Sequence, residues 1–125
     1  MRKLFLENSE DTPQVELNCE DKIYKVSGKS LPENAVAFYL PIISWLKQYG
    51  NEHTDPMVLD FRLEYFNTAS AKQITKLLLV LQDLSEKIDV KVRWYYLRED
   101  TDILSSGLRF SRLIKVNIQL IGYDE

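Results

Sequence analysis

The sequence predicts an α/β domain of two layers, with helices packed mainly on one face of a mixed β-sheet. Several segments alternate apolar and polar residues, which is the period of strands with one buried and one solvated face. In the second half of the chain, the stretches between these segments have apolar residues at helical spacing. This order indicates parallel strands joined by helical crossovers. No strand is apolar on both faces, so a sheet covered by helices on both sides is excluded. The length of 125 residues fits one domain.

The N-terminal part of the chain predicts three strands. Residues 3–6 are expected to form a short first strand or an ordered arm, and residues 15–19 alternate apolar with polar side chains. After the turn at residues 20–21, Tyr24 and Val26 continue the alternation, which predicts a β-hairpin. We expect this hairpin to end at residues 27–29.

A first helix is predicted from Ser30 to Tyr49. Ser30 and Glu33 have the spacing of a capping box, and Gly50 is a typical residue just past a helix end. The segment is apolar on nearly all sides, so we expect burial on several sides or contact with a partner. Pro41 lies inside it and removes a backbone donor, which predicts a kink or a break just before the proline.

The second half of the chain alternates strands and helices. Strands are predicted at residues 57–65, 90–96 and 114–120, and helices at 68–87 and 102–113. The strand, helix, strand order implies right-handed crossovers and parallel pairing.

Charged side chains occupy the polar faces of two of these strands. Asp60, Arg62 and Glu64 should share the solvated face of the sheet with Lys91 and Arg93. We expect them to pair across strands at the surface.

Composition restricts the classes of function. The net charge of −3 argues against a nucleic-acid surface, and in the aromatic run near Arg93 only Tyr95 should face solvent. One cysteine, Cys19, and one histidine, His53, exclude an intrachain disulfide and a zinc cluster. No secretory leader or membrane-spanning run is visible, so a cytoplasmic protein that needs no membrane is expected.

Catalysis is not predicted. The glycines are scattered singly rather than gathered in a phosphate-binding loop, and no Ser-His arrangement appears. No cofactor or metal is predicted either. A small hydrolase or transferase built on acidic residues remains as the alternative from another class of function.

Polar side chains crowd the start of the predicted helix at residues 68–87. Asn67, Thr68 and Ser70 are typical helix-capping residues, and capping alone would account for them. The free N–H groups and positive dipole end of a helix also favour an anion, so a phosphate attached there would be stabilised. Both interpretations stay open from these residues alone.

One leucine is anomalous on the same helix. Leu79 falls on the outer, polar side, opposite the apolar face centred near Ile74, Leu77 and Leu81. This predicts a partner-binding surface along the helix. Its candidate residues are Asn67, Thr68, Ser70, Lys72, Thr75 and Leu79.

Three blocks of the chain, taken together, carry a family resemblance. They are residues 27–46 with the run Ser-Gly-Lys-Ser-Leu-Pro-Glu-Asn-Ala, residues 63–70 with Asn-Thr-Ala-Ser, and residues 94–110 with Trp-Tyr-Tyr and the acidic Glu-Asp-Thr-Asp. In this combination the chain, from about Glu16 to its C-terminus, resembles the SiaC family of bacterial regulatory phosphoproteins.

The resemblance implies a STAS-like fold and a phosphorylation switch. It implies that a partner protein kinase phosphorylates the threonine that matches Thr68, with Ser70 as the alternative acceptor, and that a PP2C-type phosphatase removes the phosphate. Ala69 stands where a serine is common in the family. The unphosphorylated form is then expected to bind and activate a diguanylate cyclase, which raises cyclic di-GMP. The related alternative is an anti-anti-sigma-like antagonist in a partner-switching cascade.

Overall fold

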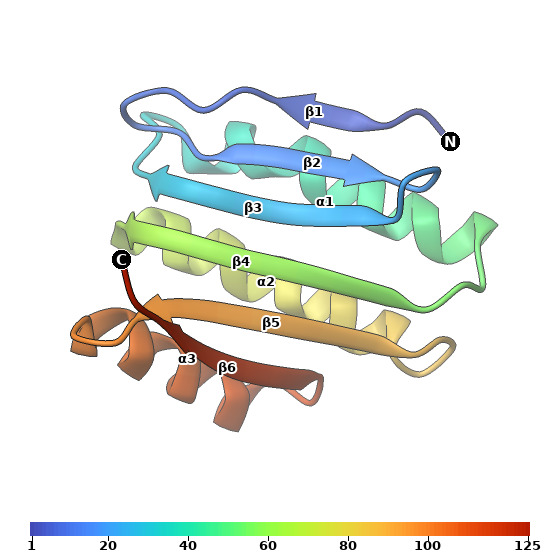
Figure 1. Cartoon of the computed structure of the whole chain (residues 1–125). Coiled ribbons are helices and arrows are strands. Elements are labelled where there is room, and N and C mark those ends of the chain that lie inside the picture. The colour runs from blue at the N-terminus through green and yellow to red at the C-terminus, as the bar shows by residue number, and fades with distance from the viewer.

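A computed structural model describes all 125 residues and places six strands in one sheet, ordered as in the chain (Figure 1). The elements are β1 (Leu4–Leu6), β2 (Gln14–Asn18), β3 (Ile23–Ser30), α1 (Ala35–Glu52), β4 (Met57–Phe66), α2 (Thr68–Leu84), β5 (Val90–Leu97), α3 (Thr101–Leu113) and β6 (Asn117–Tyr123). Strands β1, β2 and β3 pair antiparallel, whereas β3, β4, β5 and β6 pair parallel. The predicted hairpin and the predicted mixed sheet are therefore confirmed.

All three helices cover the same face of the sheet (Figure 1). From β3 onward, each strand is followed by a helix and then by its immediate neighbour in the sheet. Right-handed crossovers that always step in one direction place their helices on one side. The predicted two-layer arrangement is confirmed.

The core lies between the sheet and the helices, with Trp94 of β5 near its centre. The indole ring packs against Phe61 and Phe110, with ring centroids 5.5 Å away in each case. Its Nε1 donates a hydrogen bond to the carbonyl of Ile103 at 2.9 Å. Gly107 of α3 lies so close that an added Cβ would stand 2.7 Å from the Trp94 Nε1, so only glycine fits there.

The opposite face of the sheet is solvated and charged, as predicted. Arg93 on β5 and Asp60 on β4 are register partners and form a two-pronged ion pair, with Nη2 to Oδ2 at 2.8 Å. Arg62 lies over the ring of Tyr123 at 4.1 Å, and Tyr95 lies beside it on this face. Hydrogen bonding to Asp60 raises the pKa of Arg93 further. The predicted cross-strand charge pairing is therefore confirmed for Asp60 and Arg93, whereas Arg62 contacts aromatic rings.

The predicted start of the first helix is wrong. Strand β3 continues through Ser30, and α1 begins at Ala35. Asn34 caps this helix, and its side chain accepts a hydrogen bond from the Ala37 N–H at 3.0 Å. Ser30 is fully buried at the end of the strand, so its spacing from Glu33 does not form a capping box. The competing cap at Asn34 has the same preference for helix N-termini.

The predicted end of this helix is also wrong, and of the predicted kink or break at Pro41 the break is wrong. Helix α1 passes through Gly50 to Glu52 and ends at His53, whose N–H bonds to the Tyr49 carbonyl at 2.9 Å. Gly50 is placed for packing rather than termination, since an added Cβ would stand 3.0 Å from Leu84 Cδ1. The helix is continuous across Pro41, which lies on an exposed side.

Candidate functional site

The start of α2 follows directly from the end of β4. Asn67 is the N-cap residue, and its side-chain oxygen accepts a hydrogen bond from the Ser70 N–H at 2.9 Å. Its carbonyl accepts from the Ala71 N–H, also at 2.9 Å, so Thr68 is the first residue of the helix. No acidic side chain occupies the first turn. The first turn of α2 therefore supplies no carboxylate of its own to balance the positive end of the helix dipole.

The two hydroxyl residues of this turn have opposite environments. Thr68 is exposed, whereas Ser70 has no exposed surface. The Ser70 hydroxyl donates to the Ser30 carbonyl at 2.9 Å and accepts from the Ser30 hydroxyl at 2.9 Å. The expectation that Ser70 lies on a docking surface, or is open to a kinase, is wrong, because the side chain is part of the core.

A buried polar cluster holds this helix start in place. Ser30 from β3, Tyr39 from α1 and Ser70 from α2 share hydrogen bonds, with Ser30 Oγ 2.7 Å from the Tyr39 hydroxyl. Burial raises the pKa of Tyr39 to about 12, although its hydrogen bonds to the two serines act in the other direction. The Asn67 N–H also bonds to the Ser30 carbonyl, at 3.1 Å. Sequence reasoning does not reveal this cluster, because the local pattern favours Ser30 as a helix cap.

The remaining predicted surface residues share one stripe of α2. Thr68, Lys72, Thr75 and Leu79 are spaced i, i+4, i+7 and i+11, which places them on one helix side. Lys72 is exposed, Leu79 is 42% exposed, and Thr75 is half-buried with its hydroxyl donating to the Ala71 carbonyl at 2.9 Å. We call these four residues the α2 outer stripe. Asn67 borders the stripe, with its side chain engaged in the cap.

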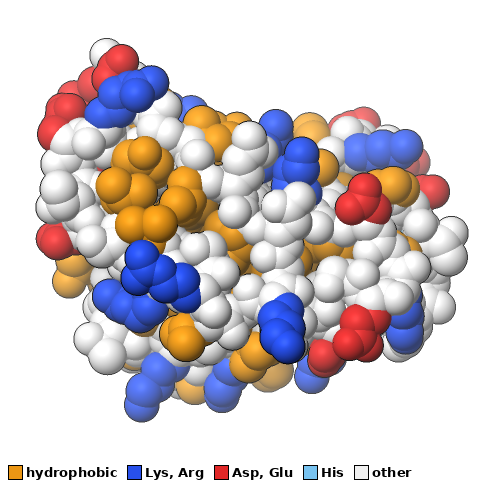
Figure 2. Space-filling model, turned by 90° about the horizontal axis from the view of Figure 1, so that it is seen from below, with side chains coloured by type: hydrophobic (Ala, Val, Ile, Leu, Met, Phe, Trp, Pro, Cys, Tyr) orange, Lys and Arg blue, Asp and Glu red, His pale blue; other side chains and the backbone are white.

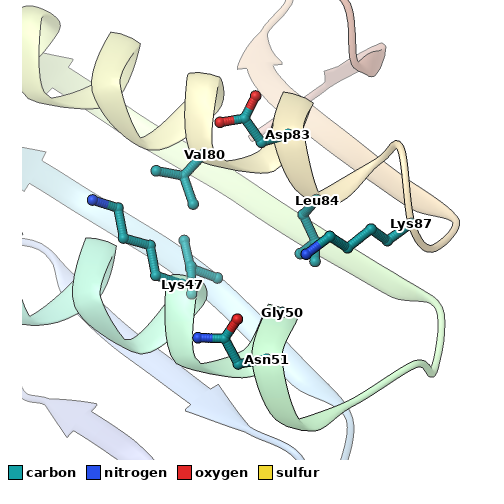
Figure 3. A pocket seen from close by; sticks show the side chains of 8 residues that line it. Lys47, Gly50, Asn51, Val80, Asp83, Leu84 and Lys87 are labelled. Atoms are coloured by element: carbon teal, nitrogen blue, oxygen red, sulfur yellow. The ribbon is translucent and has the colours of Figure 1, made fainter.

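A surface cavity of about 320 Å³ opens between the C-terminal halves of α1 and α2 (Figure 3). Its walls combine apolar side chains with charged ones. They are Leu46, Lys47, Gly50, Asn51, Val80, Asp83, Leu84 and Lys87. With a single carboxylate among them, these walls do not supply the paired acids that the alternative of a hydrolase or transferase requires.

Acidic side chains gather in a smaller cavity of about 140 Å³ at the end of β4. Glu64, Asp100 and Asp102 contribute to its lining. Asp100 is already engaged as the N-cap of α3, since it accepts a hydrogen bond from the Ile103 N–H at 3.0 Å. Helix capping therefore accounts for one of these acids.

Other chemistry-bearing groups are dispersed. Cys19 Sγ lies 3.8 Å from His53 Nε2, and burial raises the pKa of this thiol, which keeps it protonated. No group of three or more His, Cys, Asp or Glu side chains is arranged to hold a metal ion. No helix has both the length and the apolar character needed to cross a bilayer.

The surface seen from the side of β6 and α3 carries no wide area of a single charge. Figure 2 shows acidic and basic side chains interspersed there, with hydrophobic side chains in several groups. This side therefore lacks the broad basic surface typical of nucleic-acid binding.

Comparison with known proteins gives a consistent result. A family model described as SiaC family regulatory phosphoprotein matches residues 6–123. An uncharacterized protein of Pseudomonas aeruginosa (strain UCBPP-PA14) is 25% identical over 126 residues, which span all of both chains.

Two solved structures share the fold. Apo-SiaC of Pseudomonas aeruginosa superposes with a TM-score of 0.90 at 24% identity, covering 97% of this chain and 99% of that one. SiaC in a crystal structure with the diguanylate cyclase SiaD, whose activator it is, has a TM-score of 0.90 at 23% identity, covering 96% and 99%.

Proposed function

Because the chain belongs to the SiaC family of regulatory phosphoproteins, we propose that it is a non-enzymatic switch controlled by phosphorylation of Thr68. The observation that carries the proposal is the contrast within one helical turn. Thr68 is exposed at the positive end of α2, whereas the Ser70 side chain is buried and its hydroxyl is hydrogen-bonded. The exposure of Thr68 supports phosphorylation of this residue in the folded domain.

The surroundings of Thr68 suit a phosphate. A phosphoryl group carries about −1.5 to −2 charges and three acceptor oxygens. The first-turn amides would stabilise it, and Lys72 lies one turn further along the same stripe. The domain therefore keeps its fold in both states, and only the docking surface changes.

The change in docking follows from desolvation and charge. A partner that packs against the bare threonine must desolvate or repel a dianion after phosphorylation. A coupling free energy of roughly 1–3 kcal/mol changes affinity about 5- to 150-fold, which is enough for a switch. Leu79 supplies the apolar contact of the α2 outer stripe.

The partners we propose are a protein kinase, a PP2C-type phosphatase and a diguanylate cyclase that the unphosphorylated form binds. The cyclase is suggested by the complex of the Pseudomonas aeruginosa protein with SiaD. The kinase and the phosphatase are the enzymes that a reversible threonine phosphate requires. An anti-anti-sigma-like antagonist is the second candidate, and it differs in the protein that is bound.

A pair of substitutions tests the switch. We expect immobilised Thr68→Ala protein to retain a cyclase from the cells of origin, and Thr68→Asp protein to retain about 5-fold less or lower still. The matched control is Thr101→Asp, which places a carboxylate at the first residue of α3. Thr101 is also an exposed threonine beside a capping residue, Asp100.

The outcomes separate the candidates. The proposal is supported if a cyclase binds the Thr68→Ala and Thr101→Asp proteins and does not bind the Thr68→Asp protein. Recovery of an anti-sigma factor in its place favours the second candidate. Equal retention by the Thr68→Ala and Thr68→Asp proteins would overturn the switch.

A further inference from the structure

A second exposed surface begins on α1, along the side of this helix that borders α2. Val36 and Leu40 of α1 are 57% and 59% exposed, and Ile43 beside them is half-buried. Their spacing of i, i+4 and i+7 continues to Lys47 at i+11, which lines the cavity between α1 and α2. An apolar ridge on α1 therefore leads into this cavity.

Helix α2 supplies the other border. Val80, Asp83 and Lys87 line the same cavity, and Figure 3 shows Val80 and Lys47 on the facing sides of the two helices. Lys76 precedes Val80 by one turn, and Lys72 precedes Lys76 by another, so both exposed lysines continue this border toward the start of α2.

We define the α1–α2 strip as the apolar residues Val36, Leu40, Ile43 and Val80 with the charged residues Lys47, Lys72, Lys76, Asp83 and Lys87. The charge on this strip is opposite to that of the chain. The strip contains four lysines and one aspartate and is therefore positively charged, whereas the whole chain has a net charge of −3.

We infer that the α1–α2 strip binds an amphipathic helix of a partner protein whose polar flanks are acidic. Apolar residues repeated along a helix are the usual seat for the apolar face of another helix. The distance from Val36 to Lys47 along α1 corresponds to about 16 Å, or three helical turns, at 1.5 Å per residue. The lysines on both borders select acidic flanks, and the cavity accepts an apolar side chain at one end of the bound helix.

The strip and the α2 outer stripe share Lys72, and this gives a consequence that rests on the proposed function. A phosphate on Thr68 would pair with Lys72 four residues further on and would repel an acidic helix. The strip itself requires no modification, so it can be tested on the unmodified protein.

Two synthetic helical peptides form the test. They share the same leucine positions over about three to four turns and differ only in glutamate or lysine on the flanks. Binding to the full ¹⁵N-labelled chain is followed by chemical-shift changes of the backbone amides. We expect the glutamate peptide to shift residues 36–47 and 72–87, and to bind at least about tenfold more tightly than the lysine peptide at low salt.

Variants locate the contact. We expect Leu40→Ser to weaken binding of the glutamate peptide at least about tenfold, because it removes the most exposed apolar contact of the strip. Leu113→Ser is the matched control, since Leu113 is 69% exposed on another helix. Lys47→Glu with Lys76→Glu should reverse the preference between the peptides, whereas Lys91→Glu on the open sheet face should leave it unchanged.

Several results would overturn the inference. These are shift changes outside residues 36–47 and 72–87, equal affinity for both peptides, or Leu113→Ser weakening binding as much as Leu40→Ser. A dimer that Leu40→Ser converts to a monomer in sedimentation would make a second copy of this chain the occupant instead. Thermal unfolding of each variant confirms that the fold is retained. None of these readouts depends on whether Thr68 is phosphorylated, so the two proposals fail independently.

Discussion

A negative charge at Thr68 should stabilise the fold, even though we expect it to weaken docking. Thr68→Asp places a carboxylate at the first residue of α2, where no acidic side chain is present in the first turn. An exposed charge at a helix end contributes about 0.3–1 kcal/mol. Pairing with Lys72, four residues on, adds about 0.2–0.5 kcal/mol.

The gain is large enough to measure. With an unfolding entropy of about 2.1 cal/mol/K per residue, a chain of 125 residues gains about 2–6 °C in Tm from about 0.5–1.5 kcal/mol. The assay is urea and thermal unfolding of Thr68→Asp beside Thr68→Asn, which has nearly the same shape without the charge. At about 1 M salt the Debye length falls to about 3 Å, so most of the difference should disappear.

One result would refute this reasoning. If Thr68→Asp is no more stable than Thr68→Asn at low salt, the start of α2 does not favour an anion. A phosphate there would then need some other source of stabilisation.

Further substitutions test the docking surface and the core. Leu79→Lys should leave the free energy of unfolding within about 0.5 kcal/mol of the parent and weaken cyclase binding, as measured by calorimetry. Ser70→Ala should lower the free energy of unfolding in urea by about 1–2 kcal/mol and leave partner binding unchanged. Gly107→Ala should cost about 1–3 kcal/mol, because its Cβ overlaps the Trp94 ring, and fluorescence of that indole should change with it. The pKa of Tyr39 rises on folding from 10.0 to about 12, so its contribution to stability is complete below pH 10.0 and is lost as the pH rises toward 12. In Tyr39→Phe, the free energy of unfolding measured in urea should therefore fall less steeply over this pH range.

Each of these has an opposing outcome. Unchanged cyclase affinity in Leu79→Lys would remove that residue from the docking surface. Loss of binding in Ser70→Ala without loss of stability would give the buried hydroxyl a role in recognition. A Gly107→Ala protein as stable as the parent would show that α3 can move away from the sheet. If the free energy of unfolding of Tyr39→Phe depends on alkaline pH in the same way as that of the parent, the group that titrates is not Tyr39.

Periodicity predicted most of the fold because each strand has one apolar side. The alternation in β4 and β5 and the change to helical spacing after Thr68 fixed the order of elements and the position of the α2 start. Boundaries were less predictable where two residues have the same local preference. Ser30 and Asn34 are both good helix caps, and only tertiary contacts with Tyr39 and Ser70 decide that Ser30 ends a strand.

The candidate site was predictable in part for the same reason. The exposure of Leu79 follows from helical geometry, and the structure agrees. The burial of Ser70 depends on Ser30, forty residues away in the chain, and spacing cannot reveal such a contact. The exposed ridge at Val36 and Leu40 was also hidden, because α1 is apolar on nearly all sides and the sequence does not show which side the sheet covers.

The most direct test of the switch is a phosphosite map of the protein isolated from its own cells, with and without phosphatase treatment. Cleavage after Arg62 and Lys72 yields a peptide of residues 63–72 that contains both Thr68 and Ser70, and fragmentation between them assigns the phosphate. We predict phosphate on Thr68 that phosphatase removes, and none on Ser70. Phosphate at other positions with none on Thr68 would contradict the account.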